Sequence, residues 1–332
     1  MNALLLRLLA LAAAVAMVVG ALAVRNRMDD DKVSRSTELR LLCATELEAA
    51  CDAIEDDPDS SVTVTVEEVG TTLDRLAEAD VAGFDGWLTP GPFPQMVRET
   101  RKADGHTALI DRVSRPLARS RVVIAMWKER ATALATRCVD RAVEWKCLGD
   151  AAGRPWKDVG GRDTWGSVKT ALPDPTTTAA GVVTLGAATA TFFGQPDVGS
   201  LDINESDAYG AWLNNLKTAN VNVDVARMLA AGGPSIADAA AGLEVSVKPV
   251  VDAAAASAEV SLIYPSPVAT ADVFLGTVTS ERAALLAELL EGSLGRAALR
   301  AGGWQIGNAG LPPTSYLPVP GLLAALRDRW AQ

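Results

Sequence analysis

Short apolar segments alternate with amphipathic ones near the start of the chain, and this alternation restricts the fold more than any other feature. Residues 38–44 and 61–69 have the apolar and β-branched patterns of strands, and residues 84–91 are a third short apolar segment. The segments between them, 45–57 and 73–80, have helical spacing. Alternation of strands and helices predicts an α/β fold with a parallel sheet.

The rest of the chain continues this alternation less regularly. We predict strands at 121–127, 166–175 and 258–267. Residues 176–194 are rich in Ala, Gly and β-branched residues, but the segment is too long for a strand and predicts a buried helix. Residues 320–331 predict a closing helix that begins at a proline. No repeat or shift in composition marks a domain boundary, as expected of two lobes between which the chain crosses.

The N-terminal segment indicates export from the cytoplasm. Within residues 1–24, the segment from Ala3 to Val24 is apolar except for Arg7 and is near the roughly 20 residues that span a bilayer. The segment also ends in small residues of the kind that precede signal-peptide cleavage. We therefore expect either a transmembrane anchor or a signal peptide, then a polar linker at 25–37. The remaining chain is expected outside the cytoplasm, anchored to the membrane through this segment or secreted.

The four cysteines agree with an exported protein. Cys43 and Cys51 are close in sequence, as are Cys138 and Cys147. An even number of cysteines outside the cytoplasm indicates disulfides rather than a zinc site. Sequence alone allows three connectivities, and we favour the two local pairs.

Composition and motifs argue against several classes of function. The net charge of −10 disfavours nucleic-acid binding, which needs clustered Lys and Arg. The chain has one histidine, which disfavours a catalytic relay or a multi-histidine metal site. It also lacks the nucleophile-elbow, zinc-protease and phosphate-loop motifs. We expect no catalytic residues, metal or cofactor.

Threonines follow three of the predicted strands. Thr45 follows the first, Gly70-Thr71-Thr72 the second, and Thr176-Thr177-Thr178 a proline turn after residues 166–175. Ligands of open α/β sheets bind at the carboxyl ends of strands, where helix N-termini present free N–H groups. These threonines are candidate ligand contacts. The alternative is helix capping, which Thr45 with Glu48 would perform as a capping box.

Five stretches, taken in order, carry a resemblance to a known family. They are residues 39–54, 67–91, 168–188, 260–278 and 303–330. Together they resemble extracytoplasmic solute-binding proteins of ABC importers, in the two-lobed group that contains the molybdate- and sulfate-type binders. The last two stretches are most like a membrane-tethered branch of Ala-rich bacterial proteins.

The resemblance implies a periplasmic-binding-protein-like fold of class II, in which each lobe is a mostly parallel sheet flanked by helices. It places residues 38–120 and 259–332 in lobe 1 and residues 121–258 in lobe 2. The protein would be a monomer that captures a small anionic or carboxylate-bearing solute in the cleft and delivers it to an ABC permease. The residues expected to face the cleft are Thr45, Gly70, Thr71, Thr72, Thr176, Thr177, Thr178 and Tyr264.

One residue departs from the pattern of the oxyanion binders. Thr45 is followed by Glu46, where those proteins carry adjacent small hydroxyl residues. A carboxylate there would repel an oxyanion such as molybdate or sulfate. A second hypothesis therefore stands beside solute capture, namely a membrane-tethered interaction or sensory module with the same fold and no transport ligand.

Overall fold

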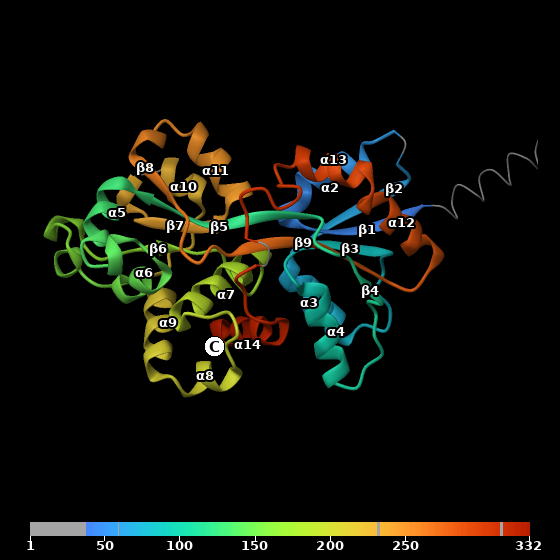
Figure 1. Cartoon of the computed structure of the whole chain (residues 1–332), viewed down its shortest axis with the longest axis horizontal. Helices are drawn as coiled ribbons and strands as arrows, with labels where there is room; N and C mark the ends of the chain where they lie inside the picture. Colours follow the sequence, from blue (N-terminus) through green and yellow to red (C-terminus); the bar gives the residue numbers. More distant parts are fainter. Residues whose placement is uncertain (1–37, 59, 231–232, 313–314) are drawn as a thin grey trace, which may run out of the picture.

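The computed structural model describes residues 38–58, 60–230, 233–312 and 315–332. Strands of two sheets run through the middle of the molecule in the order β2-β1-β3-β9-β5-β7-β6, with helices on both faces (Figure 1). The predicted two-lobed α/β class is confirmed. The predicted anchor or signal at 1–24 and the linker at 25–37 lie outside the described residues. Within the described residues, no helix is long and apolar enough to cross a membrane.

The first sheet contains the three strands predicted from the opening alternation. These strands, β2 (Val62–Glu67), β1 (Leu39–Ala44) and β3 (Gly86–Pro90), are parallel. β9 (Thr270–Thr277) adds to β3 antiparallel, and β4 (Arg112–Val113) pairs with β9. In Figure 1, one face carries α2, α12 and α13, and the other carries α3 and α4. Their bounds are Glu48–Glu55 for α2, Glu281–Glu291 for α12, Ser293–Ala301 for α13, Val69–Glu78 for α3 and Phe93–Ala103 for α4.

A single strand, β5 (Ala118–Trp127), belongs to both sheets. Its first four residues pair with β9, and the following residues pair with β7 (Ala239–Leu243) and β8 (Val260–Ile263). The second sheet is mixed rather than mostly parallel, because β5 runs antiparallel to both of these neighbours. Its parallel pair joins β7 to the short β6 (Thr170–Ala171). The chain returns to the first sheet between β8 and β9.

The helices of the second lobe surround this mixed sheet, with α5, α10 and α11 towards one side and α6 to α9 towards the other (Figure 1). Their bounds are Lys128–Ala135 for α5, Trp145–Ala151 for α6, Ala179–Phe193 for α7, Ser200–Glu205 for α8, Asp207–Ala219 for α9, Val225–Ala230 for α10 and Glu244–Ala253 for α11. The closing helix α14 (Pro320–Ala331) contacts both α7 in this lobe and α4 in the first.

The buried helix predicted at 176–194 is α7. It begins after Thr178, whose Oγ1 accepts the Gly181 N–H at 3.0 Å, and it ends at Gly194 in the left-handed region with φ of 72°. Its small residues let neighbours approach closely. A Cβ added to Gly186 would lie 2.5 Å from the Leu323 side chain of α14. The Ala/Gly composition of α7 therefore serves close packing rather than strand formation.

Three local expectations were wrong. The capping box fails because residues Thr45–Leu47 form a 3₁₀ turn, and α2 begins at Glu48 without a side-chain cap. Gly70-Thr71-Thr72 lies in the first turn of α3 rather than in a separate turn before a helix. The strand predicted at 166–175 is limited to the two residues of β6, because the segment with its prolines turns towards α7.

Both local disulfides are present, and no cysteine is free. Cys43–Cys51 joins the end of β1 to α2, with a Cα–Cα distance of 6.6 Å. Cys138–Cys147 has a Cα–Cα distance of 5.5 Å and closes the turn that precedes α6. The predicted pairing is confirmed.

Candidate functional site

Turns from the two lobes meet at the carboxyl ends of their strands. Glu46, directly after β1, accepts the backbone N–H of Ala180 at 2.8 Å, in the first turn of α7. Gly70, after β2, donates its N–H to the Thr177 carbonyl at 2.8 Å. The segments predicted as separate ligand turns are thus brought together at one place, which we call the lobe junction. It comprises residues 45–46, 69–70 and 174–181.

Gly70 allows the two backbones to touch. A Cβ at this position would lie 2.0 Å from the Thr176 carbonyl oxygen and 2.8 Å from Thr177 Cα. No side chain larger than hydrogen fits without separating the lobes. The requirement comes from close approach, because Gly70 itself lies in an ordinary helical turn.

Protein groups already occupy the N-terminus of α7. Helix N-termini present N–H groups that favour a negative charge. Here the Thr178 hydroxyl accepts a hydrogen bond from the Gly181 N–H, and the Glu46 carboxylate accepts one from the Ala180 N–H. Burial raises the pKa of the Glu46 carboxyl, although the Ala180 N–H favours its charged form. Glu46 therefore stands where an anionic ligand would be expected.

Arg327 of α14 ties the two sides of the junction together. Its guanidinium donates to the Thr176 carbonyl, with Nη2 at 3.2 Å and Nε at 3.3 Å, and Nη2 also reaches Asp74 Oδ1 of α3 at 2.8 Å. Its side chain is 16% exposed, whereas that of Asp74 is 68% exposed. One side chain of the closing helix therefore bonds to α3 in the first lobe and to the threonine turn in the second.

The predicted threonines have different local roles. Thr176 donates its Oγ1 and N–H to Asp174 Oδ1, at 2.7 and 2.8 Å, and Thr178 caps α7. Thr72 is buried and donates to Glu67 at 2.6 Å. Thr45 and Thr71 are exposed. The hydrogen bonds between the lobes involve the Gly70 and Thr177 backbones, Glu46, and the Thr176 carbonyl that accepts from Arg327.

Tyr264 belongs to a separate cluster at the strand shared by the two sheets. Its hydroxyl donates to Glu244 Oε1 at 2.7 Å, and the Arg121 guanidinium lies 4.7 Å from its ring centre. Arg121 also pairs with Glu244, at 2.7 Å. Burial and the neighbouring Glu244 raise the pKa of Tyr264 to about 12. These contacts hold β5 to the start of α11 and do not involve the threonine turns.

A pocket of about 430 Å³ opens beside the lobe junction, within the second lobe. It lies at the carboxyl ends of β6 and β7 and is bounded by the start of α7 and by α10 and α11. Sequence reasoning identified Thr178 but missed the residues from α10 and α11. The lining residues are Ala171, Leu172, Pro173, Asp174, Thr178, Ala180, Asn222, Val223, Asp224, Val225, Ala226, Ala241, Gly242, Leu243, Ser246, Val247 and Val250.

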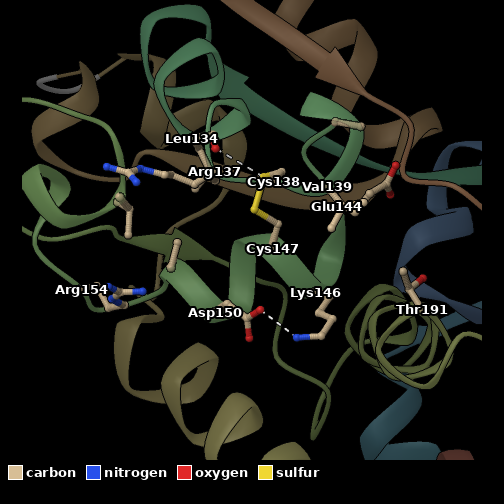
Figure 2. A pocket seen from close by; sticks show the side chains of 13 residues that line it. Leu134, Arg137, Cys138, Val139, Glu144, Lys146, Cys147, Asp150, Arg154 and Thr191 are labelled. Atoms are coloured by element: carbon tan, nitrogen blue, oxygen red, sulfur yellow. Dashed lines mark hydrogen bonds and ion pairs between the residues drawn. A yellow bond between two sulfur atoms is a disulfide. The ribbon is translucent and has the colours of Figure 1, made fainter.

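A second pocket of about 470 Å³ lies against the Cys138–Cys147 disulfide (Figure 2). Lys146 and Asp150 pair with each other at 2.8 Å on one side of it, while Arg137 and Arg154 lie on the opposite side in the view. None of the residues predicted to bind ligand lines this pocket. Across the described part of the chain, no group of three or more His, Cys, Asp or Glu residues is arranged to hold a metal ion.

Solved structures with the same architecture are distant in sequence. AfuA, a periplasmic binding protein from Actinobacillus pleuropneumoniae with bound fructose-6-phosphate, is 13% identical with a TM-score of 0.58, over 89% of this chain and 97% of its own. A periplasmic thiamin binding protein is 15% identical with a TM-score of 0.56, over 88% and 93%. An ABC transporter protein from Clostridium perfringens is 13% identical with a TM-score of 0.52, over 88% and 97%.

The sequence has no significant match among curated proteins. The profile of one protein family, however, matches residues 39–305, which include both sheets and the lobe junction. That span covers most of the chain, and the resemblance inferred from the sequence is confirmed at this level. The chain belongs to the family of bacterial extracellular solute-binding proteins.

Proposed function

We propose that the protein captures a small solute at the lobe junction, outside the cytoplasm, and delivers it to an ABC-type importer. Residues 1–24 would anchor it to the membrane or direct its secretion. Family membership supports solute binding, and similar folds in proteins described as periplasmic binding and ABC transporter proteins support the delivery step.

The observation that carries the proposal is that the lobes are connected in two different ways, by a shared strand and by hydrogen bonds at the lobe junction. On one side the lobes share β5, and this connection is continuous. At the junction they are joined by the Gly70–Thr177 and Glu46–Ala180 hydrogen bonds and by Arg327. Separation there breaks these hydrogen bonds, each worth about 1 kcal/mol, and the packing of α14 against α7. The molecule is therefore suited to bending at the shared strand.

Opening would expose the residues that we propose as solute contacts. Residues 38–120 and most of 259–332 would move against residues 121–258, with β8 attached to the latter. Glu46 would leave Ala180, and Gly70 would leave Thr177. The hydroxyls of Thr176, Thr177 and Thr178 and the N-terminus of α7 would then face the solute.

Thr177→Val tests this proposal. The side chain is half-buried, and its backbone carbonyl, which contacts Gly70, is retained in the variant. We expect the variant to keep its stability but to bind a solute about tenfold more weakly, as for the loss of one hydrogen bond. The solute is first found by thermal unfolding of the full chain against oxyanions, amino acids, peptides, sugars and polyamines. A ligand at about 100 times its Kd stabilises by about 2.7 kcal/mol.

Thr218→Val on the exposed face of α9 is the matched control. If Thr177→Val and Thr218→Val bind the solute equally well, the threonine triple is not part of the site.

The second candidate is an interaction or sensory module. It is favoured by the direct backbone contact at Gly70 and by the Arg327 bonds, which hold the lobes together without a ligand. Small-angle scattering separates the two proposals. A transport receptor should change its radius of gyration with an identified solute, whereas a module held closed should show neither a solute response nor a change in shape.

A further inference from the structure

We propose that the pocket beside the lobe junction binds an uncharged or cationic organic solute with an apolar body, and not an oxyanion. This inference rests on the proposed function and specifies the ligand class of a pocket that shares Asp174, Thr178 and Ala180 with the lobe junction. It reverses the expectation that the resemblance raised, that of an anionic or carboxylate-bearing ligand.

The shape and lining of the pocket suit an organic molecule. Its volume of about 430 Å³ is typical of small-molecule sites. Apolar side chains dominate the lining, among them Leu172, Pro173, Val223 and Val247. The pocket lies at the carboxyl ends of β6 and β7, the side of an open α/β sheet on which ligands bind. A desolvated oxyanion would gain little from such walls.

The charged side chains that line the pocket determine which ligand charge it favours. The lining residues that the structure describes include no Lys, Arg or His, and their two ionisable side chains are Asp174 and Asp224. Asp174 accepts the Thr176 N–H and hydroxyl through Oδ1, and Asp224 accepts the Arg227 N–H through Oδ1. In each case Oδ2 makes none of these bonds, so it can accept from a ligand ammonium or hydroxyl.

The groups that would hold an anion are already engaged. Ala180 also lines the pocket, but its N–H donates to Glu46 Oε1, while the Gly181 N–H donates to Thr178. An incoming anion would have to displace Glu46 and would then lie near the carboxylates of Asp174 and Asp224. An ammonium or a neutral hydroxyl meets no such repulsion.

Three probes with one skeleton and different charge test the proposal. They are 2-phenylethylammonium, 2-phenylethanol and phenylacetate, titrated into the full chain by calorimetry beside sulfate and molybdate. We expect the ammonium to bind best, the alcohol about two- to fivefold more weakly, as for loss of a partly exposed ion pair, and phenylacetate and the oxyanions not measurably.

Substitutions of lining residues test whether the probes bind in this pocket. Asp174→Asn and Asp224→Asn keep the oxygen that accepts the backbone N–H and remove the charge, so together they should lower ammonium affinity to that of the alcohol. Asp202→Asn is the matched control, since Asp202 accepts the Gly199 N–H at 2.8 Å and does not line the pocket. Ala226→Phe should abolish binding of both probes by filling the pocket, whereas Ala253→Phe, at the exposed end of α11, should not.

Preferred binding of phenylacetate, sulfate or molybdate would overturn the proposal, as would failure of all the probes to bind. Binding that is insensitive to Ala226→Phe would also overturn it. A different result distinguishes failure of this proposal from failure of the proposed function. A solute from the broader panel whose binding is weakened by Thr177→Val, but not by Ala226→Phe or the Asn variants, would leave solute capture standing and remove this pocket from it.

Discussion

Arg327 reaches both lobes from one helix, and its removal should loosen the lobe junction without unfolding the protein. Arg327→Met removes the guanidinium and keeps an unbranched side chain that can pack in its place. The bond to Asp74 contributes at most about 1 kcal/mol, because 68% of the Asp74 side chain is exposed. The better-buried bonds to the Thr176 carbonyl add about 1 kcal/mol.

The bonds to Thr176 are the ones that break when the lobes separate, and a loss of about 1 kcal/mol shifts the opening equilibrium about fivefold. The reporters are the amides of Gly70 and Ala180, whose N–H groups are bonded across the junction. Their hydrogen exchange, measured by NMR under conditions where opening is the fast pre-equilibrium, should accelerate by this factor. Amides in the β5–β9 pairing should be unchanged, because that connection stays intact.

Arg75→Met is the matched control. Arg75 of α3 donates to Glu67 Oε2 at 2.8 Å and to the Ala82 carbonyl at 3.3 Å, both within the first lobe. It therefore has an ion pair and a bond to a carbonyl, as Arg327 does, but no bond to the second lobe. If both variants accelerate exchange at Gly70 and Ala180 equally, Arg327 acts only through overall stability, and the reasoning is refuted.

Two further perturbations act on the same junction. Because burial raises the pKa of Glu46 in the folded protein above the ordinary value of 4.5, the wild type should lose stability as pH rises from about 4.5 through the folded pKa. Glu46→Gln should lack this component, and urea unfolding of both proteins at a series of pH values from about 4 to 8 measures it; parallel curves would contradict the raised pKa. Gly70→Ala places a Cβ 2.0 Å from the Thr176 carbonyl oxygen. The crowding of about 1–3 kcal/mol should favour the open form, visible as a larger radius of gyration, whereas an unchanged radius would show that the junction adapts locally.

The opening alternation was sufficient to predict the three parallel strands of the first sheet, because each has either a continuous apolar or an alternating pattern. β9 was missed although it is central, because it follows a proline-containing segment that appeared to be only a connection. β7 has the sequence Ala-Ala-Ala-Gly-Leu, which carries no strand propensity. Its pairing with β5 and β6 outweighs this local preference.

The nearness of the Thr45 and Gly70 turns follows from β1 and β2 being parallel strands of one sheet, whereas the approach of the Thr176 turn from the other sheet does not. The role of Glu46 was only partly predictable. Sequence placed a carboxylate near the cleft, but not its hydrogen bond to Ala180, far along the chain in the other lobe. Arg327 carried no signal at all, because its importance depends on where α14 packs.

The membership of β5 in both sheets has a consequence for how this chain can change over evolutionary time. Side chains alternate between the two faces of a strand, so a one-residue insertion or deletion inverts the facing of every residue beyond it. Within Ala118–Arg121 such a change would invert the register of the strand as it enters the second sheet, while the pairing with β9 holds the preceding residues in place. Variants of this protein should therefore keep the length of β5 at ten residues.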